Sequence, residues 1–163
     1  MVPALKPIIL LDIDGVLNPV ARPGGGEMSL PGLWLPEAKV SLVRRLAECG
    51  RIAWVSTWPA DQTASLESQL DLDVAPLRVT LTVRAGDSDE PTPKLRSVRR
   101  WLTKMELVGE ADWDAVVWID DVLGPDAREW ASRHTQPVLL ERPGPAQGMS
   151  EVHVVAVEVF VEA

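Results

Sequence analysis

The stretch IILLDIDGVLN, residues 8–18, places two carboxylates directly after the most hydrophobic run of the chain. Asp12 and Asp14 are two positions apart, so on an extended backbone their side chains would share one face and repel each other. A nearby cation, usually a metal ion, stabilises such a pair. The stretch therefore predicts a buried strand that ends at a cation site. The alternative is a strand end at which water alone solvates the two acids.

Length and composition favour one globular domain, which we expect to span residues 1–163. Hydrophobic residues make up 46% of the 163 residues, and the formal net charge is −8. This acidic balance argues against a broad nucleic-acid-binding surface but leaves room for a local phosphate site. The single cysteine, Cys49, excludes an internal disulfide and favours a cytoplasmic setting. No apolar run is long enough to cross a membrane.

Short apolar runs alternate with segments of helical periodicity along the chain. We expect strands over 7–11, 51–55, 77–83, 114–119 and 137–141, and helices over 36–49, 60–70, 93–105 and 126–134. The tail, 151–161, is rich in β-branched residues, which favours a strand, but Ser150 suits a helix N-cap, and we predict a helix. This alternation predicts an α/β three-layer sandwich around a central parallel sheet of the five strands.

Polar side chains follow three of the expected strands, at the point where each strand ends. These side chains are Asp12 and Asp14, Ser56 and Thr57, and Asp120 and Asp121. Open parallel sheets bind their ligands beyond the carboxyl ends of the strands. The sequence therefore predicts a site for a metal ion and an anion at this edge, and we expect Trp58 to line it.

These motifs resemble those of the haloacid dehalogenase (HAD) superfamily of phosphohydrolases. LLDIDGVLN is similar to the first motif, AWVST to the second, Lys94 to the third and VVWIDD to the fourth, in the same order over residues 8–121. WVSTW together with WIDD is also similar to small bacterial HAD domains associated with RNA-repair proteins. The resemblance implies a HAD-like Rossmannoid fold and a phosphatase.

The resemblance also implies catalytic and metal-binding roles for four carboxylates. Asp12 would be the nucleophile that forms an aspartyl-phosphate, and Asp14 would protonate the leaving oxygen and then deprotonate water. Mg²⁺ would bind Asp12, the backbone carbonyl of Asp14, and Asp121. Asp120 would either bind the ion too or hold one of its ligands in place. Asn18 would tie down the loop after the first strand.

Three further residues would bind the phosphate. Ser56 would donate a hydrogen bond to a phosphoryl oxygen, and Thr57 is the alternative because both follow the strand. Lys94 would neutralise the charge that develops during transfer. The alternative for Lys94 is a solvated basic helix face, since Arg96, Arg99 and Arg100 follow it.

The spacing of the motifs leaves no room for a cap, the inserted domain that HAD enzymes acting on small metabolites usually carry. The interval between the first and second motifs must hold the helix over 36–49, and the interval between the second and third already holds a helix and a strand. The Gly/Pro-rich loop over 19–35 would cover the site only in part. We therefore expect an open site that prefers phosphate on a larger carrier, a nucleic-acid end or a protein, docked on the basic patch of Arg96, Arg99 and Arg100.

Other interpretations stay open. A second subunit could cover the site and restore specificity for a small substrate. The same scaffold could serve a phosphotransferase or a nucleic-acid-end phosphatase, although the acidic net charge does not support nucleic acid. A binding domain without turnover is a further alternative, but the intact pair of Asp12 and Asp14 argues against it, because such a domain has no physical need for the second acid.

Overall fold

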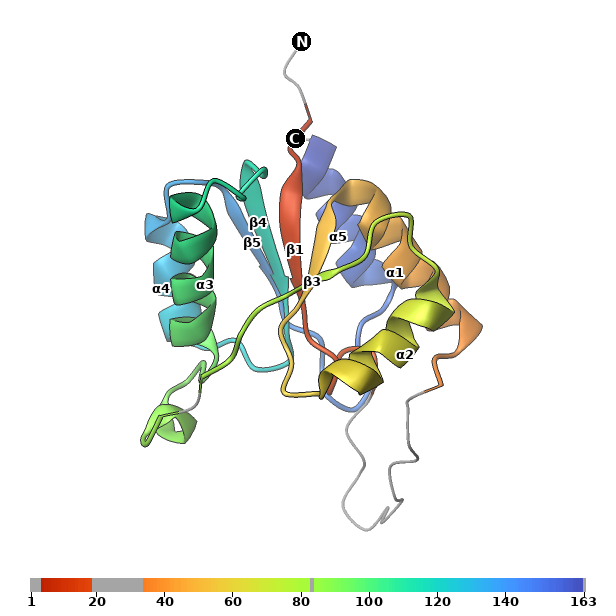
Figure 1. Ribbon diagram of the computed structural model, residues 1–163, viewed down its shortest axis with the longest axis horizontal. Helices are drawn as coiled ribbons and strands as arrows, with labels where there is room; N and C mark the ends of the chain where they lie inside the picture. Colours follow the sequence, from red (N-terminus) through yellow and green to blue (C-terminus); the bar gives the residue numbers. More distant parts are fainter. Residues whose placement is uncertain (1–3, 19–33, 83, 163) are drawn as a thin grey trace.

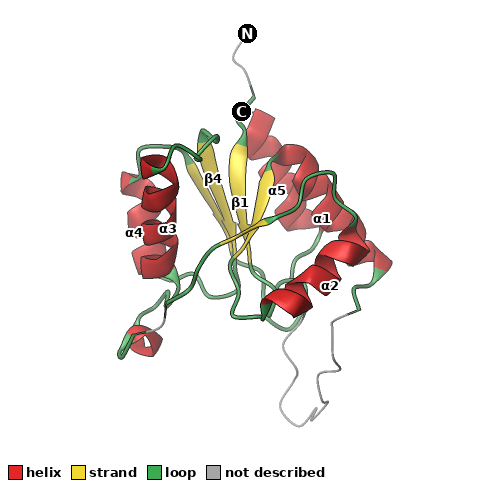
Figure 2. Ribbon diagram, viewed as in Figure 1, coloured by secondary structure: helices red, strands yellow, loops and turns green. Residues whose placement is uncertain are grey.

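The protein forms one sheet of five strands, and a computed structural model describes residues 4–18, 34–82 and 84–162 of it (Figures 1 and 2). The strands are β1 (Pro7–Leu11), β2 (Arg51–Trp54), β3 (Leu77–Arg78), β4 (Ala115–Ile119) and β5 (Val138–Glu141). The helices are α1 (Glu37–Cys49), α2 (Ala60–Leu70), α3 (Leu95–Leu107), α4 (Pro125–Arg133) and α5 (Glu151–Glu162), with a short 3₁₀ helix, η1 (Asp87–Asp89). All strand pairs are parallel, which confirms the predicted α/β class.

The strands divide their side chains between two helical layers. Ile9 and Leu11 of β1 pack in the core that includes residues of α1, α2 and α5, whereas Ile8 and Leu10 pack with residues of α3 and α4. Successive strand side chains point to opposite faces, and helices cover both faces here, so every residue of β1 and β4 is buried (Figure 1). The three-layer sandwich is thereby confirmed.

The strand order β3-β2-β1-β4-β5 puts β1 at the centre of the sheet. The chain adds β2 and β3 on one side of β1 and then crosses to the other side for β4 and β5. Leu11 pairs with Trp54 of β2 and with Ile119 of β4, so these strands end at one level. This reversal of direction opens the crevice in which such sheets bind ligands.

The third strand is shorter than the predicted 77–83, and the prediction of a strand over 79–82 is wrong, while residue 83 lies outside the described residues. Only Leu77–Arg78 belong to the sheet, although the backbone N–H of Val79 still donates to the Trp54 carbonyl over 2.9 Å. Further on, the backbone N–H of Thr82 donates to Ser97 Oγ of α3 over 3.0 Å. Side chains of α3, Ser97 and Arg96, thus satisfy the backbone N–H and carbonyl of Thr82 in place of a neighbouring strand.

The β-branched tail is the helix α5, as predicted. Val154 and Val157 are fully buried in the core shared with α1. Arg45 of α1 forms salt bridges with Glu158 over 2.7 Å and with Glu151 over 2.5 Å. Packing and ion pairing against α1 outweigh the strand preference of the valines.

The described residues contain no cap. Only α2, β3 and η1 lie between β2 and α3, and the expected covering loop falls, except for Trp34 and Leu35, outside the described residues. None of the helices in the described ranges is long and apolar enough to cross a membrane.

Candidate active site

Asp12 lies at the end of β1 with 4% of its surface exposed. Its Oδ1 is 2.9 Å from Lys94 Nζ, and its backbone N–H donates to the Ile119 carbonyl of β4 over 3.1 Å. Burial, followed by repulsion from Asp120, raises the pKa of Asp12 to about 8, although Lys94 acts in the opposite direction. The charged form of Asp12 therefore needs more positive charge than Lys94 alone supplies.

Lys94 reaches from the start of α3 into the centre of the site. Its Nζ lies 2.9 Å from Asp12 Oδ1, 3.1 Å from Asp120 Oδ2 and 3.1 Å from the Val55 carbonyl oxygen. Burial acts to lower the pKa of Lys94, but the charges of Asp120 and Asp12 outweigh it and raise that pKa. The ammonium group thus stays charged and uses its three donors inside the site rather than on a solvated helix face.

Asp120 follows β4 and is completely buried. Its Oδ1 accepts a hydrogen bond from the backbone N–H of Val122 over 3.1 Å. Its Oδ2 accepts from Lys94 and, over 3.3 Å, from Trp118 Nε1. Both oxygens are therefore already held by the protein, which fixes this carboxylate in place.

Asp121 is only partly buried and lies against the backbone of Gly15. Gly15 has φ +79°, and a Cβ added there would come within 2.3 Å of the Asp121 carboxylate. The Asp121 carbonyl accepts a hydrogen bond from Arg142 Nε over 3.2 Å. The loop after β1 can approach this carboxylate because residue 15 has no side chain.

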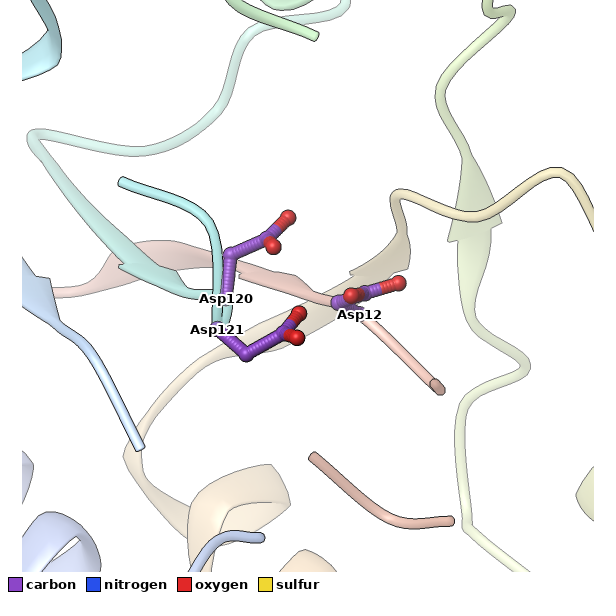
Figure 3. A group of neighbouring side chains, drawn as sticks. All are labelled: Asp12, Asp120 and Asp121. Atoms are coloured by element: carbon purple, nitrogen blue, oxygen red, sulfur yellow. The ribbon is translucent and has the colours of Figure 1, made fainter. Parts of the chain in front are cut away.

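Asp12, Asp120 and Asp121 form one group of carboxylates (Figure 3). Each offers an oxygen, and these oxygens all lie within 4.8 Å of one another. Such hard oxygen ligands suit Mg²⁺, and two of the carboxylates are buried, so the residues fit a divalent cation. The side chain of Asp14 is not part of this group, and the predicted contribution of its backbone carbonyl stays a prediction.

Asp14 points to Trp58 and Asn18 instead. Trp58 Nε1 donates to Asp14 Oδ2 over 3.0 Å, and Asn18 Nδ2 donates to Oδ1 over 3.2 Å. Trp58 is itself held, because its backbone N–H donates to Ser56 Oγ over 3.1 Å and its carbonyl accepts from Arg78. Asp14 is exposed, so these two donors set the direction of its carboxylate.

The sequence could not identify Asp14 as the partner of Trp58. The only signal is the position of a tryptophan two residues after Ser56, at the end of β2. Trp118, which donates to Asp120, lies inside the motif VVWIDD, but the motif does not reveal that contact. Arg142, which donates to the Asp121 carbonyl, gives no sequence signal.

Ser56 and Thr57 differ in exposure. Ser56 is 4% exposed, whereas Thr57 is an exposed residue. The Ser56 hydroxyl accepts the hydrogen bond from Trp58, and that bond does not use its own hydrogen. Ser56 could therefore still donate to an anion, and the preference for Ser56 over Thr57 stays a prediction.

Comparison with known proteins gives one finding. No curated protein and no solved structure matches the chain. The family described as "HAD domain in Swiss Army Knife RNA repair proteins" matches residues 8–154, from β1 into α5. The matched range includes all the motif residues discussed above. The chain therefore belongs to this family of HAD domains.

Proposed function

We propose that the protein is a Mg²⁺-dependent phosphomonoester hydrolase that works through an aspartyl-phosphate on Asp12. The observation that carries this proposal is the ammonium group of Lys94 between Asp12 and Asp120, with Asp121 beside them, at the ends of β1 and β4. Membership of a HAD family supports a hydrolase scaffold. Mg²⁺ held by the three carboxylates would offset the negative charge of the phosphate and of its nucleophile.

The first step is a displacement at phosphorus. A carboxylate oxygen of Asp12 forms a bond to phosphorus while the bond between phosphorus and the leaving oxygen breaks. The electron pair stays on the leaving oxygen, which takes a proton from Asp14. Trp58 and Asn18 hold the Asp14 carboxyl in one direction for this transfer.

The second step restores the enzyme. Asp14, now ionised, takes a proton from a water molecule whose oxygen attacks phosphorus, and the bond between phosphorus and Asp12 breaks. Inorganic phosphate leaves, and Asp12 regains its carboxylate. Lys94 and Ser56 would bind phosphoryl oxygens in both steps.

We propose further that the phosphate stands at the end of an RNA strand. The described residues supply no cap, so a small phosphate ester would find few contacts besides those to its phosphate. The family description, which refers to RNA repair proteins, supports RNA as the carrier. The single cysteine, half-buried Cys49, is consistent with a reducing cytoplasm.

Hydrolysis of an aryl phosphate with and without Mg²⁺ tests the proposal. We expect turnover that requires Mg²⁺ and disappears in Asp12→Asn. We also expect a terminal phosphate on an RNA oligonucleotide to give a higher kcat/KM than a nucleoside monophosphate does. A low KM for one small metabolite in a demonstrated monomer would overturn the proposed carrier, and inactivity toward every phosphate ester would overturn the proposed hydrolase.

A further inference from the structure

A groove of about 710 Å³ runs along the exposed side of α3. Thr92, Pro93 and Leu95 line it at the start of the helix, and Thr103, Lys104 and Leu107 line it toward the other end. Pro93 and Leu95 flank Lys94 in the sequence, and the Lys94 side chain reaches Asp12. The groove therefore begins at the two residues that flank Lys94 and leads away along α3, although no residue of the candidate active site lines it.

Four cations line this groove in a protein whose formal net charge is −8. They are Arg96, Arg99, Arg100 and Lys104, all on α3. Arg96 is paired with Asp87 over 2.8 Å, and Arg100 donates to Thr82 Oγ1 over 3.2 Å. Arg99 and Lys104 are exposed and form no hydrogen bond or salt bridge within the described part of the chain. These two cations are available to a ligand.

Three acids also line the groove, and two of them are engaged. Asp87 binds Arg96, and Asp126 accepts hydrogen bonds from both the backbone N–H and the hydroxyl of Thr92. Glu90 is the third acid, and like the other two it belongs to a segment outside α3. The face of α3 itself offers only cations, threonine and leucine to the groove.

We infer that this groove binds the phosphodiester backbone of a single-stranded RNA whose terminal phosphate enters the active site. The inference rests on the proposed function for the identity of the strand. A helix of 13 residues spans ~20 Å, which corresponds to at most about six nucleotides at the rise of a stacked strand. The groove thus supplies the contacts to the carrier that an uncapped site lacks.

The alternative occupant, an acidic peptide, fits the groove less well. Peptide docking on a helix face usually needs buried apolar anchors in a pocket. The apolar side chain at the far end of the groove, Leu107, is 82% exposed and therefore offers no buried anchor site. The evenly spaced phosphates of a nucleic-acid strand match the available side chains of Arg99 and Lys104 better.

The test is binding of unphosphorylated single-stranded RNA, labelled with a fluorophore and measured by anisotropy in EDTA. The variant is Arg99→Gln/Lys104→Gln. The control is Arg128→Gln/Arg133→Gln, which removes the same charge from exposed positions of α4. A thermal melt of each variant shows that it is folded.

We expect the affinity of the wild-type protein to rise with length up to about six nucleotides and then to level off. The groove variant should bind roughly tenfold more weakly, and its slope of log K against log salt should be less negative by about 1.4, or 0.7 for each lost phosphate contact. The control should bind like the wild-type protein.

Four results would overturn the inference. The first is an equal loss of RNA affinity in the groove variant and the control, and the second is an affinity that does not depend on RNA length. The third is tighter binding of single-stranded DNA than of RNA, and the fourth is tighter binding of a polyglutamate of equal charge than of RNA. Because the strand carries no terminal phosphate, this result does not depend on turnover. If the protein bound this RNA but hydrolysed no phosphate ester, the proposed function would be contradicted and the RNA-binding groove would not.

Discussion

The indole nitrogen of Trp58 donates a hydrogen bond to the Asp14 carboxylate over 3.0 Å and so connects the segment after β2 to the loop after β1. The same carboxylate accepts from Asn18, and it stands apart from the group formed by Asp12, Asp120 and Asp121. The site therefore separates Asp14, the proposed proton carrier, which is fixed by neutral donors, from the group of three acids that we propose binds Mg²⁺.

Trp58→Phe keeps an aromatic ring but removes the indole N–H from Asp14. A hydrogen bond to a charged group contributes about 1.5–3 kcal/mol, so misplacing Asp14 should lower kcat/KM roughly 10–100-fold for alkyl phosphates. The loss should be small for aryl phosphates with good leaving groups, because these need little protonation. Kinetics on a leaving-group series measures the difference, since kcat/KM covers the steps up to the phosphorylated enzyme.

The control for this substitution is Trp130→Phe, which removes an indole that packs on Trp118 rather than on Asp14. It should leave the dependence on the leaving group unchanged. A uniform loss over the whole series in Trp58→Phe would show that Trp58 only supports the structure.

Gly15→Ala should disturb the position of Asp121 itself. A Cβ would come within 2.3 Å of its carboxylate, and the positive φ adds strain of about 1–2 kcal/mol. Gly109→Ala is the matched control, because Gly109 has φ +75° and nothing within 4 Å of an added Cβ. Both variants should melt earlier, but only Gly15→Ala should lose the rise in melting temperature that Mg²⁺ produces. Equal responses to Mg²⁺ would contradict the role given to this close approach.

Asp121→Ala should abolish stabilisation by Mg²⁺ more completely than Asp120→Ala. The protein already binds both oxygens of Asp120, whereas Asp121 is the more accessible carboxylate. At a hundredfold excess over its Kd, Mg²⁺ should stabilise the wild-type protein by about 2.7 kcal/mol. Melting curves in EDTA and in Mg²⁺ give the two differences. A larger loss in Asp120→Ala would reverse the assignment of the main ligand.

Raising the pH should destabilise the metal-free protein. The pKa of Asp12 is about 8 in the folded protein against its ordinary value of 3.8. Between pH 3.8 and about 8 the folded state keeps a proton on Asp12 that the unfolded state has lost. The free energy of unfolding therefore falls as the pH rises from 3.8 to about 8. The melting temperature in EDTA should fall over this range, and less steeply in Asp12→Asn. Identical slopes in the two proteins would show that Asp12 is not the group that titrates.

The sequence predicts the three layers and the parallel sheet well because short, mostly apolar runs alternate with segments of helical periodicity. Leu11, Val55 and Ile119 end their apolar runs next to polar residues, so the edge that carries the site follows from the class of fold. The early end of β3 could not be predicted, because it depends on the contact of Thr82 with Ser97 of α3.

Within the site, the strand-end position of Asp12 and Asp120 shows in the sequence, but the orientation of side chains does not. The direction of Asp14 depends on Trp58, which is 44 positions away in the chain. Such contacts depend on how the loops pack, and no local pattern encodes that packing.

Phosphate trapped on Asp12 is the most direct test of the proposed mechanism. In Asp14→Asn the first displacement can still proceed with an activated aryl phosphate, but the second lacks the group that deprotonates water. Mass spectrometry of the acid-quenched variant after mixing with that substrate and Mg²⁺ should therefore show a phosphate adduct on Asp12, which should be absent from Asp12→Asn/Asp14→Asn. Hydrolysis by Asp12→Asn at the wild-type rate, or an adduct on a different residue, would contradict the account.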